Sequence, residues 1–424
     1  MSEKSQKQAN PLWTKNFTII TAGSIVSMLG SALAGFAMSL LVLDYTGSTF
    51  LYALYNFFYI LPSVVMPLIS GPFLDRFSRR KTIYTLDFVT AGVYVVLAFI
   101  LKSGLFNFAV LAVGCFVIGA IESVYFVAYE SFYPLLITEG NYSKAYSVAS
   151  TLETLTMVMV PVSAFVYNKV GIVPLFLINS LSYLAAAILE TRIKADETYI
   201  QTQKENLQKD DAGKSKPAKQ FWYDFKEGMR YLLSEKGLLA IAIYFTFSSF
   251  SGAASGAVTL PYFKKTFPNG EYIYMLVWGM LDIGRAIGGG IHYKLKLPEE
   301  KKFTIAFAVY ITISILDGCY LYFPVAVMMI FCFLNGILGV TSYNIRISAT
   351  QRYVPDEKKG RFNGTFSMMM TVGTLLGQLL SGALAESIGE RPVITIFFAI
   401  TALSAVVFIG SRRKEVAKIY NTNG

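Results

Sequence analysis

The chain carries acidic side chains inside long apolar stretches, where a carboxylate is costly unless it binds a proton, a cation or a partner side chain. Glu122, Glu153 and Asp282 are of this kind, and they are the candidates for proton coupling. Asp282 and Arg285 are three residues apart, so on a helix they would share one face and could neutralise each other. A hydrogen-bonded packing role for Glu122 and an inter-helix pair for Glu153 are the structural alternatives.

Twelve apolar stretches, each about 20 residues long, alternate with short polar segments along the chain. Hydrophobic residues make up 54% of the 424 residues and charged residues only 15%, whereas soluble domains carry about 25% charged residues. The sequence therefore predicts an all-α integral membrane protein. The expected helices lie near 17–43, 50–70, 82–101, 106–130, 144–167, 172–190, 237–262, 272–292, 303–321, 324–347, 364–386 and 392–411.

The stretches form two groups of six, separated by a charged segment. Cys115 and Gly119 of the first group recur at one common offset as Cys332 and Gly336 of the second. Paired six-helix halves are typical of transporters that hold a site near the bilayer midplane. Aromatic and aliphatic residues at roughly helical spacing after Phe221 predict an interfacial amphipathic helix. The expected parts are a cytoplasmic N-terminus (1–16), an N-terminal bundle (17–191), a cytoplasmic linker with this helix (192–236), a C-terminal bundle (237–411) and a cytoplasmic tail (412–424).

An even number of crossings places both termini on one side of the membrane, and basic residues indicate which side that is. With both termini in the cytoplasm, the loops on the other side would hold only Lys102, Lys169, Lys264, Lys265 and Arg391. We therefore expect a multi-pass protein of the plasma (inner) membrane, and residue usage suggests a bacterial source. The net charge of +10 would then face anionic lipid headgroups, so a nucleic-acid partner is not expected.

A short basic loop after the second stretch reads Gly71-Pro-Phe-Leu-Asp-Arg-Phe-Ser-Arg-Arg-Lys81. It resembles the loop between helices 2 and 3 of the major facilitator superfamily, whose pattern is Gly, three residues, Asp, Arg or Lys, one residue, Gly, then Arg and Lys. Ser78 stands where that family usually has glycine. Glu130 is expected to pair with an arginine of this loop, Arg76 or Arg79, and a solvated side chain is the alternative. The resemblance implies a cytoplasmic gate formed by Gly71, Asp75, Arg76, Arg79, Arg80 and Glu130.

Further residues are similar to those of the macrolide-efflux and enterobactin-exporter branch of that superfamily. They are Asn16-Phe17, Gly23, Ser27, Gly30-Ser31, the turn Thr46-Gly47-Ser48, and Glu227-Gly228-Met-Arg-Tyr-Leu. The resemblance implies twelve transmembrane helices in two pseudo-symmetric six-helix bundles, and it implies export. The proline-and-glycine motif of antiporters is poor, because Pro161 lies between Val160 and Val162. The direction of transport therefore rests on the resemblance.

Uncharged polar residues are expected to line the substrate cavity, which the resembled fold builds from helices 1, 4, 7 and 10. The candidates are Ser27, Ser31, Tyr125, Ser251, Ser255, Asn335, Tyr343 and Asn344. Small hydroxyl groups also pack helices together, and this is the alternative reading of the serines. The 33 phenylalanines and 27 tyrosines would suit a hydrophobic or amphipathic substrate.

No catalytic, cofactor or metal site is predicted. His292 is the only histidine, and Cys115, Cys319 and Cys332 all lie in apolar stretches, so neither a metal cluster nor a disulfide framework can be assembled. The sequence also lacks the glycine-rich stretch ending in Gly-Lys-Ser or Gly-Lys-Thr that binds ATP. We therefore do not expect an enzyme.

These features together predict a secondary active transporter that works by alternating access. The expected activity is proton-coupled efflux of a hydrophobic or amphipathic small molecule, such as a drug or secondary metabolite. Its expected partners are this substrate, protons and the lipid bilayer, and the chain is expected to be a monomer. Two alternatives stay open, proton-driven nutrient uptake by the same fold and a non-transporting membrane receptor.

Overall fold

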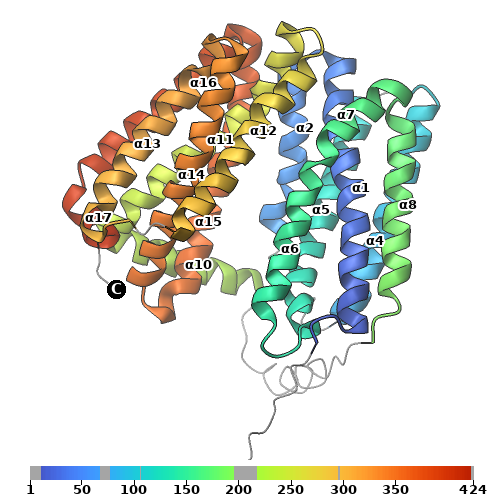
Figure 1. Ribbon diagram of the computed structural model, residues 1–424, viewed down its shortest axis with the longest axis horizontal. Coiled ribbons are helices and arrows are strands. Elements are labelled where there is room, and N and C mark those ends of the chain that lie inside the picture. The colour runs from blue at the N-terminus through green and yellow to red at the C-terminus, as the bar shows by residue number, and fades with distance from the viewer. Residues whose placement is uncertain (1–10, 67–76, 106, 195–216, 295–296, 422–424) are drawn as a thin grey trace, which may run out of the picture. The chain divides into compact units, whose positions relative to one another are not determined.

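The computed structural model describes residues 11–66, 77–105, 107–194, 217–294 and 297–421 (Figure 1). These residues are helical almost throughout, and none of them forms a strand. The chain divides into two compact units. Unit 1 comprises Met1–Tyr45 and Phe58–Pro217, and unit 2 comprises Thr46–Phe57 and Ala218–Gly424.

The first half of the chain supplies the helices of unit 1, together with one helix that begins in unit 2. They are α1 (Lys15–Thr46), α2 (Thr49–Ile60), α4 (Arg79–Lys102), α5 (Phe108–Phe132), the 3-10 turn η1 (Tyr133–Leu136), α6 (Tyr142–Met157), α7 (Met159–Val170) and α8 (Ile172–Glu190). One predicted stretch, 144–167, forms two helices, α6 and α7. Pro161 explains the break, because proline has no N–H to donate to the carbonyl of Met157, where α6 ends.

The second half of the chain begins with a helix inside the predicted linker and continues through the helices of unit 2. They are α10 (Pro217–Ser234), α11 (Lys236–Thr266), α12 (Gly270–Lys294), η2 (Glu299–Lys301), α13 (Lys302–Cys319), η3 (Tyr320–Tyr322), α14 (Val325–Tyr353), α15 (Asp356–Ile388), α16 (Glu390–Ser404), the π-helical turn η4 (Ala405–Gly410) and α17 (Arg413–Tyr420). Unit 2 also includes the segment Thr46–Phe57, which lies within the predicted N-terminal bundle. The predicted domain boundaries stay predictions.

Eleven helical segments of the described residues are long and apolar enough to cross a membrane. They include the continuous spans Thr49–Met66 and Lys144–Val170. The remaining predicted stretch forms α12, which contains Asp282, Arg285 and several glycines. The predicted all-α membrane fold is therefore confirmed.

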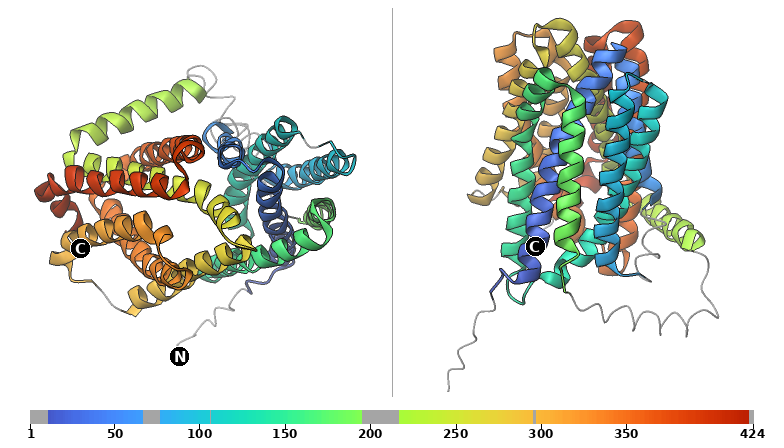
Figure 2. Two further views of the ribbon diagram at one scale, coloured as in Figure 1. Left: turned by 90° about the horizontal axis from the view of Figure 1, so that it is seen from above. Right: turned by 90° about the vertical axis from the view of Figure 1, so that its right-hand side faces the viewer.

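Within each unit, long helices pack side by side (Figure 2). In unit 1, α4 lies against α8, and in unit 2, α11 lies against α15 and α12 against α14. Glycines permit the closest of these contacts. A Cβ atom on Gly336 of α14 would lie only 2.2 Å from the carbonyl oxygen of Leu281 in α12, and one on Gly284 would lie 2.1 Å from that of Phe333. The backbones of α12 and α14 therefore meet at Gly284 and Gly336, which have no side chains to keep them apart.

Aromatic rings fill much of the core of unit 2. Tyr244 of α11 stacks on Tyr310 of α13 with ring centroids 4.3 Å apart, and Phe250 stacks on Phe397 at 4.5 Å. Tyr420 of the last helix hydrogen-bonds Tyr310 with 2.7 Å between the hydroxyl oxygens. The phenylalanines and tyrosines singled out in the sequence are thus partly structural.

Candidate functional site

Unit 1 encloses a cavity of about 490 Å³ between α1, α4, α5, α6 and α8, with Tyr59 contributed by α2. Four carboxyl groups lie on its wall, those of Asp87, Glu122, Glu130 and Glu153. Four tyrosine rings, Tyr59, Tyr125, Tyr129 and Tyr183, share the wall with them. A single molecule in the cavity would therefore contact both carboxyl groups and tyrosine rings.

Glu122 lies in α5 and is half-buried on this wall. The hydroxyl group of Tyr59 donates a hydrogen bond to Glu122 Oε2. Gly119, one turn earlier in α5, lets the two helices approach, because a Cβ atom there would lie 2.1 Å from the carbonyl oxygen of Tyr59. The close contact of α2 with α5 at Gly119 therefore also brings Tyr59 near Glu122.

Hydroxyl groups of α1 form the opposite part of the wall. Ser31 and Tyr183 share a hydrogen bond of 2.7 Å between their oxygens, and Ser24 donates to the hydroxyl of Tyr129 at 3.3 Å. Ser27 also lines the cavity, while its hydroxyl donates to the backbone carbonyl of Gly23 at 3.2 Å. Three predicted cavity residues, Ser27, Ser31 and Tyr125, therefore meet in one place.

Glu153 and Glu130 also line this cavity, but in different surroundings. Both side chains are exposed. The predicted pair of Glu130 with Arg76 or Arg79 stays a prediction. Arg79 Nη1 donates to the backbone carbonyl of Ser131 at 3.0 Å. This carbonyl lies in the last turn of α5, where helix carbonyls lack partners within the helix and attract basic side chains.

Half of the predicted gate residues, namely Gly71, Asp75 and Arg76, lie outside the described residues. Arg80 donates to the backbone carbonyl of Ile193 at 2.5 Å. Ser78, which replaces the usual glycine, caps α4 by accepting a hydrogen bond from the Lys81 amide at 3.1 Å. Its φ angle of −65° suits any residue, so serine causes no strain there.

The two predicted cavity serines of unit 2 are buried and hydrogen-bonded within the protein. Ser251 is completely buried, and its hydroxyl donates to the carbonyl of Phe397 in α16 at 2.7 Å. Ser255 is 7% exposed and lies 3.4 Å from the hydroxyl of Thr259. The Ser251 bond joins α11 to α16 and fits the helix-packing alternative for the serines. The cavity role of Ser251 stays a prediction.

The other polar candidates of unit 2 differ among themselves. Asn335 is 6% exposed and donates to the carboxyl group of Asp317. Tyr343 is exposed, and its ring lies 5.4 Å from the guanidinium of Arg346. Asn344 is half-buried, and its backbone carbonyl accepts from Ser348.

Asp282 and Arg285 of α12 form the ion pair that their spacing predicted. Arg285 Nη1 lies 3.3 Å from Asp282 Oδ1. Both side chains are more than one-third exposed, and exposed pairs of this kind contribute about 0–1 kcal/mol to stability. The geometry fits the alternative of a static pair.

The sequence reading missed one acidic pair. Asp87 of α4 is 1% exposed and Glu190, the last residue of α8, is not exposed at all. Their carboxyl groups lie within hydrogen-bonding reach of each other. Asp87 interrupts the apolar stretch 82–101, which is the signal that could have identified it. Only the packing of α4 on α8 brings Glu190 to it.

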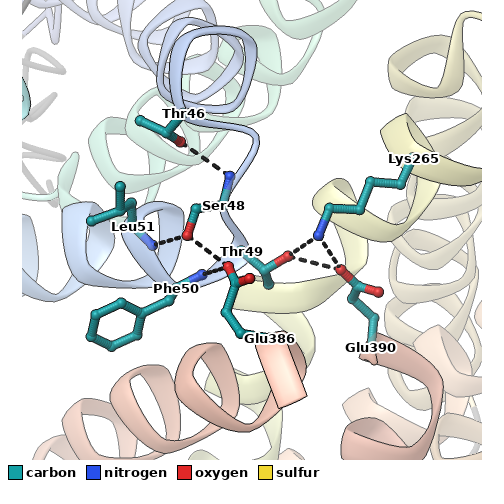
Figure 3. A network of polar contacts seen from close by, with 8 residues as sticks. All are labelled: Thr46, Ser48, Thr49, Phe50, Leu51, Lys265, Glu386 and Glu390. Atoms are coloured by element: carbon teal, nitrogen blue, oxygen red, sulfur yellow. Dashed lines mark hydrogen bonds and ion pairs between the residues drawn. The ribbon is translucent and has the colours of Figure 1, made fainter. Parts of the chain in front are cut away.

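A separate polar network in unit 2 anchors the first turn of α2 (Figure 3). Glu386 of α15 accepts hydrogen bonds from the Ser48 hydroxyl at 2.6 Å and from the Phe50 amide at 3.0 Å. Thr49 donates to Glu390 at 2.8 Å, and Lys265 of α11 pairs with the same Glu390 oxygen at 2.8 Å. Carboxylates thus satisfy the free amides at a helix N-terminus.

The segment Glu227-Gly228-Met-Arg-Tyr-Leu lies in α10, where it contacts α15. Glu227 pairs with Arg230 at 3.0 Å and with Arg361 of α15 at 3.4 Å. A Cβ atom on Gly228 would lie 2.1 Å from the hydroxyl of Thr365. This part of the motif therefore holds α10 against α15.

The chain is similar to known transport proteins over most of its length. The family model described as the Major Facilitator Superfamily matches residues 20–316 and 300–423. Macrolide efflux protein A of Streptococcus pyogenes is 23% identical over 390 residues, which cover 89% of this chain and 91% of that protein. The solved structure of the nucleoside transporter NupG superimposes with a TM-score of 0.64 at 12% identity, covering 92% of this chain and 98% of that one.

A second relative matches more strongly over a shorter range. The uncharacterized MFS-type transporter YkuC of Bacillus subtilis (strain 168) is 28% identical over 257 residues, which cover 60% of this chain. The match spans 57% of that relative. The family model covers nearly the whole sequence, and the helical membrane fold agrees with it. The chain therefore belongs to the Major Facilitator Superfamily of membrane transporters.

Proposed function

We propose that this transporter exports a hydrophobic or amphipathic small molecule in exchange for protons, by alternating access. One observation carries the proposal, the unit 1 cavity in which carboxyl groups share a wall with tyrosine rings. Aromatic rings bind apolar or cationic groups, and a carboxyl group within a membrane is a functional site by default. The likeness to macrolide efflux protein A supports export.

In the proposed mechanism, Glu122 binds a proton and a cationic substrate in turn. The ionised carboxylate attracts a cationic group, and protonation removes that attraction and releases the substrate. Tyr59 holds the carboxyl group in place through its hydrogen bond. Glu153 and Asp282 remain proposed coupling residues, and Glu153 is the one that shares the cavity with Glu122.

The orientation, the gate and the assembly are parts of the same proposal. Both termini would lie in the cytoplasm of a bacterial cell, with the chain working as a monomer in the plasma membrane. Arg79 and Arg80, which bind the carbonyls of Ser131 and Ile193, would contribute to a gate at the cytoplasmic side. Their contacts to helix ends are suited to breaking and re-forming when the helices move.

This proposal can be tested by measuring the efflux of a loaded compound from energised cells. Bacteria producing the chain are loaded with a lipophilic fluorescent cation or a macrolide, and its loss is followed after energy is supplied. We expect faster loss than in cells with the empty vector, and a protonophore should abolish the difference. Faster accumulation would favour proton-driven uptake instead. Equal rates with every compound tested would contradict export of this substrate class.

A further inference from the structure

Two carboxyl groups lie side by side in the interior of unit 1, next to the cavity. Asp87 and Glu190 are 1% and 0% exposed, and their carboxyl groups lie within hydrogen-bonding reach of each other. Three of their oxygens, Asp87 Oδ2 and both Glu190 oxygens, have no hydrogen-bond donor among the described residues. A hydrogen bond between two carboxyl groups requires that one of them carry a proton.

The elements around the pair supply no positive charge to it within the described residues. From α5, Tyr125 and Tyr129 face the pair, and from α8, Tyr183 faces Asp87. From α1, Gly23 lies against Glu190, since a Cβ atom there would lie 3.0 Å from Glu190 Oε1. None of these groups is a cation.

Two basic side chains at the start of α4 bind backbone carbonyls. Arg79 binds that of Ser131, and Arg80 binds that of Ile193. The cavity wall adds only further carboxyl groups, those of Glu122 and Glu130 on α5 and Glu153 on α6. No ion pair joins Asp87 or Glu190 to a lysine or arginine in the described part of the chain.

Simple electrostatics then fixes the charge of the pair. A buried ion costs several kcal/mol even when it is paired, and two adjacent carboxylates repel each other strongly. One proton between the two groups lowers their total charge from −2 to −1 and supplies the missing donor. A second proton would make the pair neutral.

We propose that Asp87 and Glu190 form a proton-holding site that keeps one proton between two carboxyl groups and exchanges a second with the cavity. Asp87 has the position for this exchange, because it belongs both to the pair and to the cavity wall. Glu190 lies next to it at the end of α8 and supplies the second carboxyl group.

The role of this site in transport rests on the proposed function. A cationic substrate in the cavity favours the negatively charged, singly protonated pair, so its binding expels the second proton. Departure of the substrate allows that proton to return. The exchange conserves charge, because one positive charge enters the cavity as one proton leaves it.

Infrared difference spectroscopy tests the site without any transport measurement. The purified full-length chain is reconstituted in lipid nanodiscs and titrated with base, since a protonated carboxyl group absorbs apart from a carboxylate. We expect wild type to retain, at neutral pH, the signal of one protonated carboxyl group that the double substitution Asp87→Asn with Glu190→Gln removes. Glu139→Gln, in an exposed loop position, should leave this signal unchanged.

Three results would overturn the proposal. The wild type, which needs no substitution to fold, could lack the signal at neutral pH. The signal could persist in the double variant, which has neither carboxyl group. It could also disappear on addition of sodium at constant pH, which would assign the two carboxyl groups to a metal cation. A wild-type signal without substrate-linked proton flux would instead support the site and contradict proton-coupled export.

Discussion

Replacing Gly336 with alanine is expected to destabilise unit 2 by about 1–3 kcal/mol, the usual cost of forcing extra atoms into a packed interior. The new Cβ atom would lie 2.2 Å from the carbonyl oxygen of Leu281 and 2.7 Å from the amide nitrogen of Arg285. Both are backbone atoms, so no side chain can rotate away, and α12 would have to move. Thermal unfolding of the detergent-solubilised protein should show an apparent Tm lowered by several degrees.

Gly339 provides a matched control three residues further along the same helix. A Cβ atom there meets nothing within 4 Å. Alanine at this position should leave the apparent Tm unchanged or raise it slightly, because alanine favours a helix over glycine by about 1 kcal/mol. Equal Tm values for the two variants would show that α12 and α14 do not meet at Gly336.

Replacing Glu122 with glutamine is expected to reduce substrate-driven proton flux at least about tenfold, which corresponds to about 1.4 kcal/mol. The amide keeps the size of the side chain but can neither bind a proton nor attract a cation as strongly. Proteoliposomes with a trapped pH indicator would report the loss. The cavity should still bind uncharged aromatic compounds, because its tyrosine wall is unchanged.

Asp44→Asn is the matched control for Glu122→Gln. Asp44 also lies in a membrane helix of unit 1 and also accepts a hydrogen bond from a tyrosine, Tyr167, at 2.8 Å. Asp44 does not line the cavity. Its substitution should therefore leave proton flux near the wild-type rate. Equal losses in both variants would point to a general effect of removing a membrane carboxylate, against a specific role of Glu122.

Much of the fold could be predicted from the sequence because membrane helices leave a strong local signal. Apolar length alone located the helices, including α12, which contains Asp282 and Arg285. The repeated pair of glycines is a more specific success. Gly119 and Gly336 recur at the offset between the two halves, and both allow close contact with a neighbouring backbone.

The site was harder to predict, because its residues meet only through tertiary packing. Ser27, Ser31, Tyr125 and Glu122 could be placed on one cavity from their helices. Ser251, like Ser27 and Ser31, is a serine within an apolar stretch, yet it is fully buried against α16. A serine that faces a cavity and one that joins two helices look alike until the packing is known.

The pair of Asp87 and Glu190 shows the same limit for charged residues. Asp87 could have been found as an acidic residue within an apolar stretch. Glu190 lies at the end of its stretch, where a solvated side chain is the ordinary interpretation. Their partnership depends on the contact between α4 and α8 and has no counterpart in local sequence.

Proton movement during substrate transport is the most direct test of the proposed exchange. The wild-type protein is reconstituted in liposomes with a pH indicator inside, and a lipophilic cation or a macrolide is added under an imposed substrate gradient. Exchange predicts protons moving opposite to the substrate, at a rate that follows substrate concentration and falls in Glu122→Gln. Protons moving with the substrate, or substrate flux without any proton movement, would contradict it.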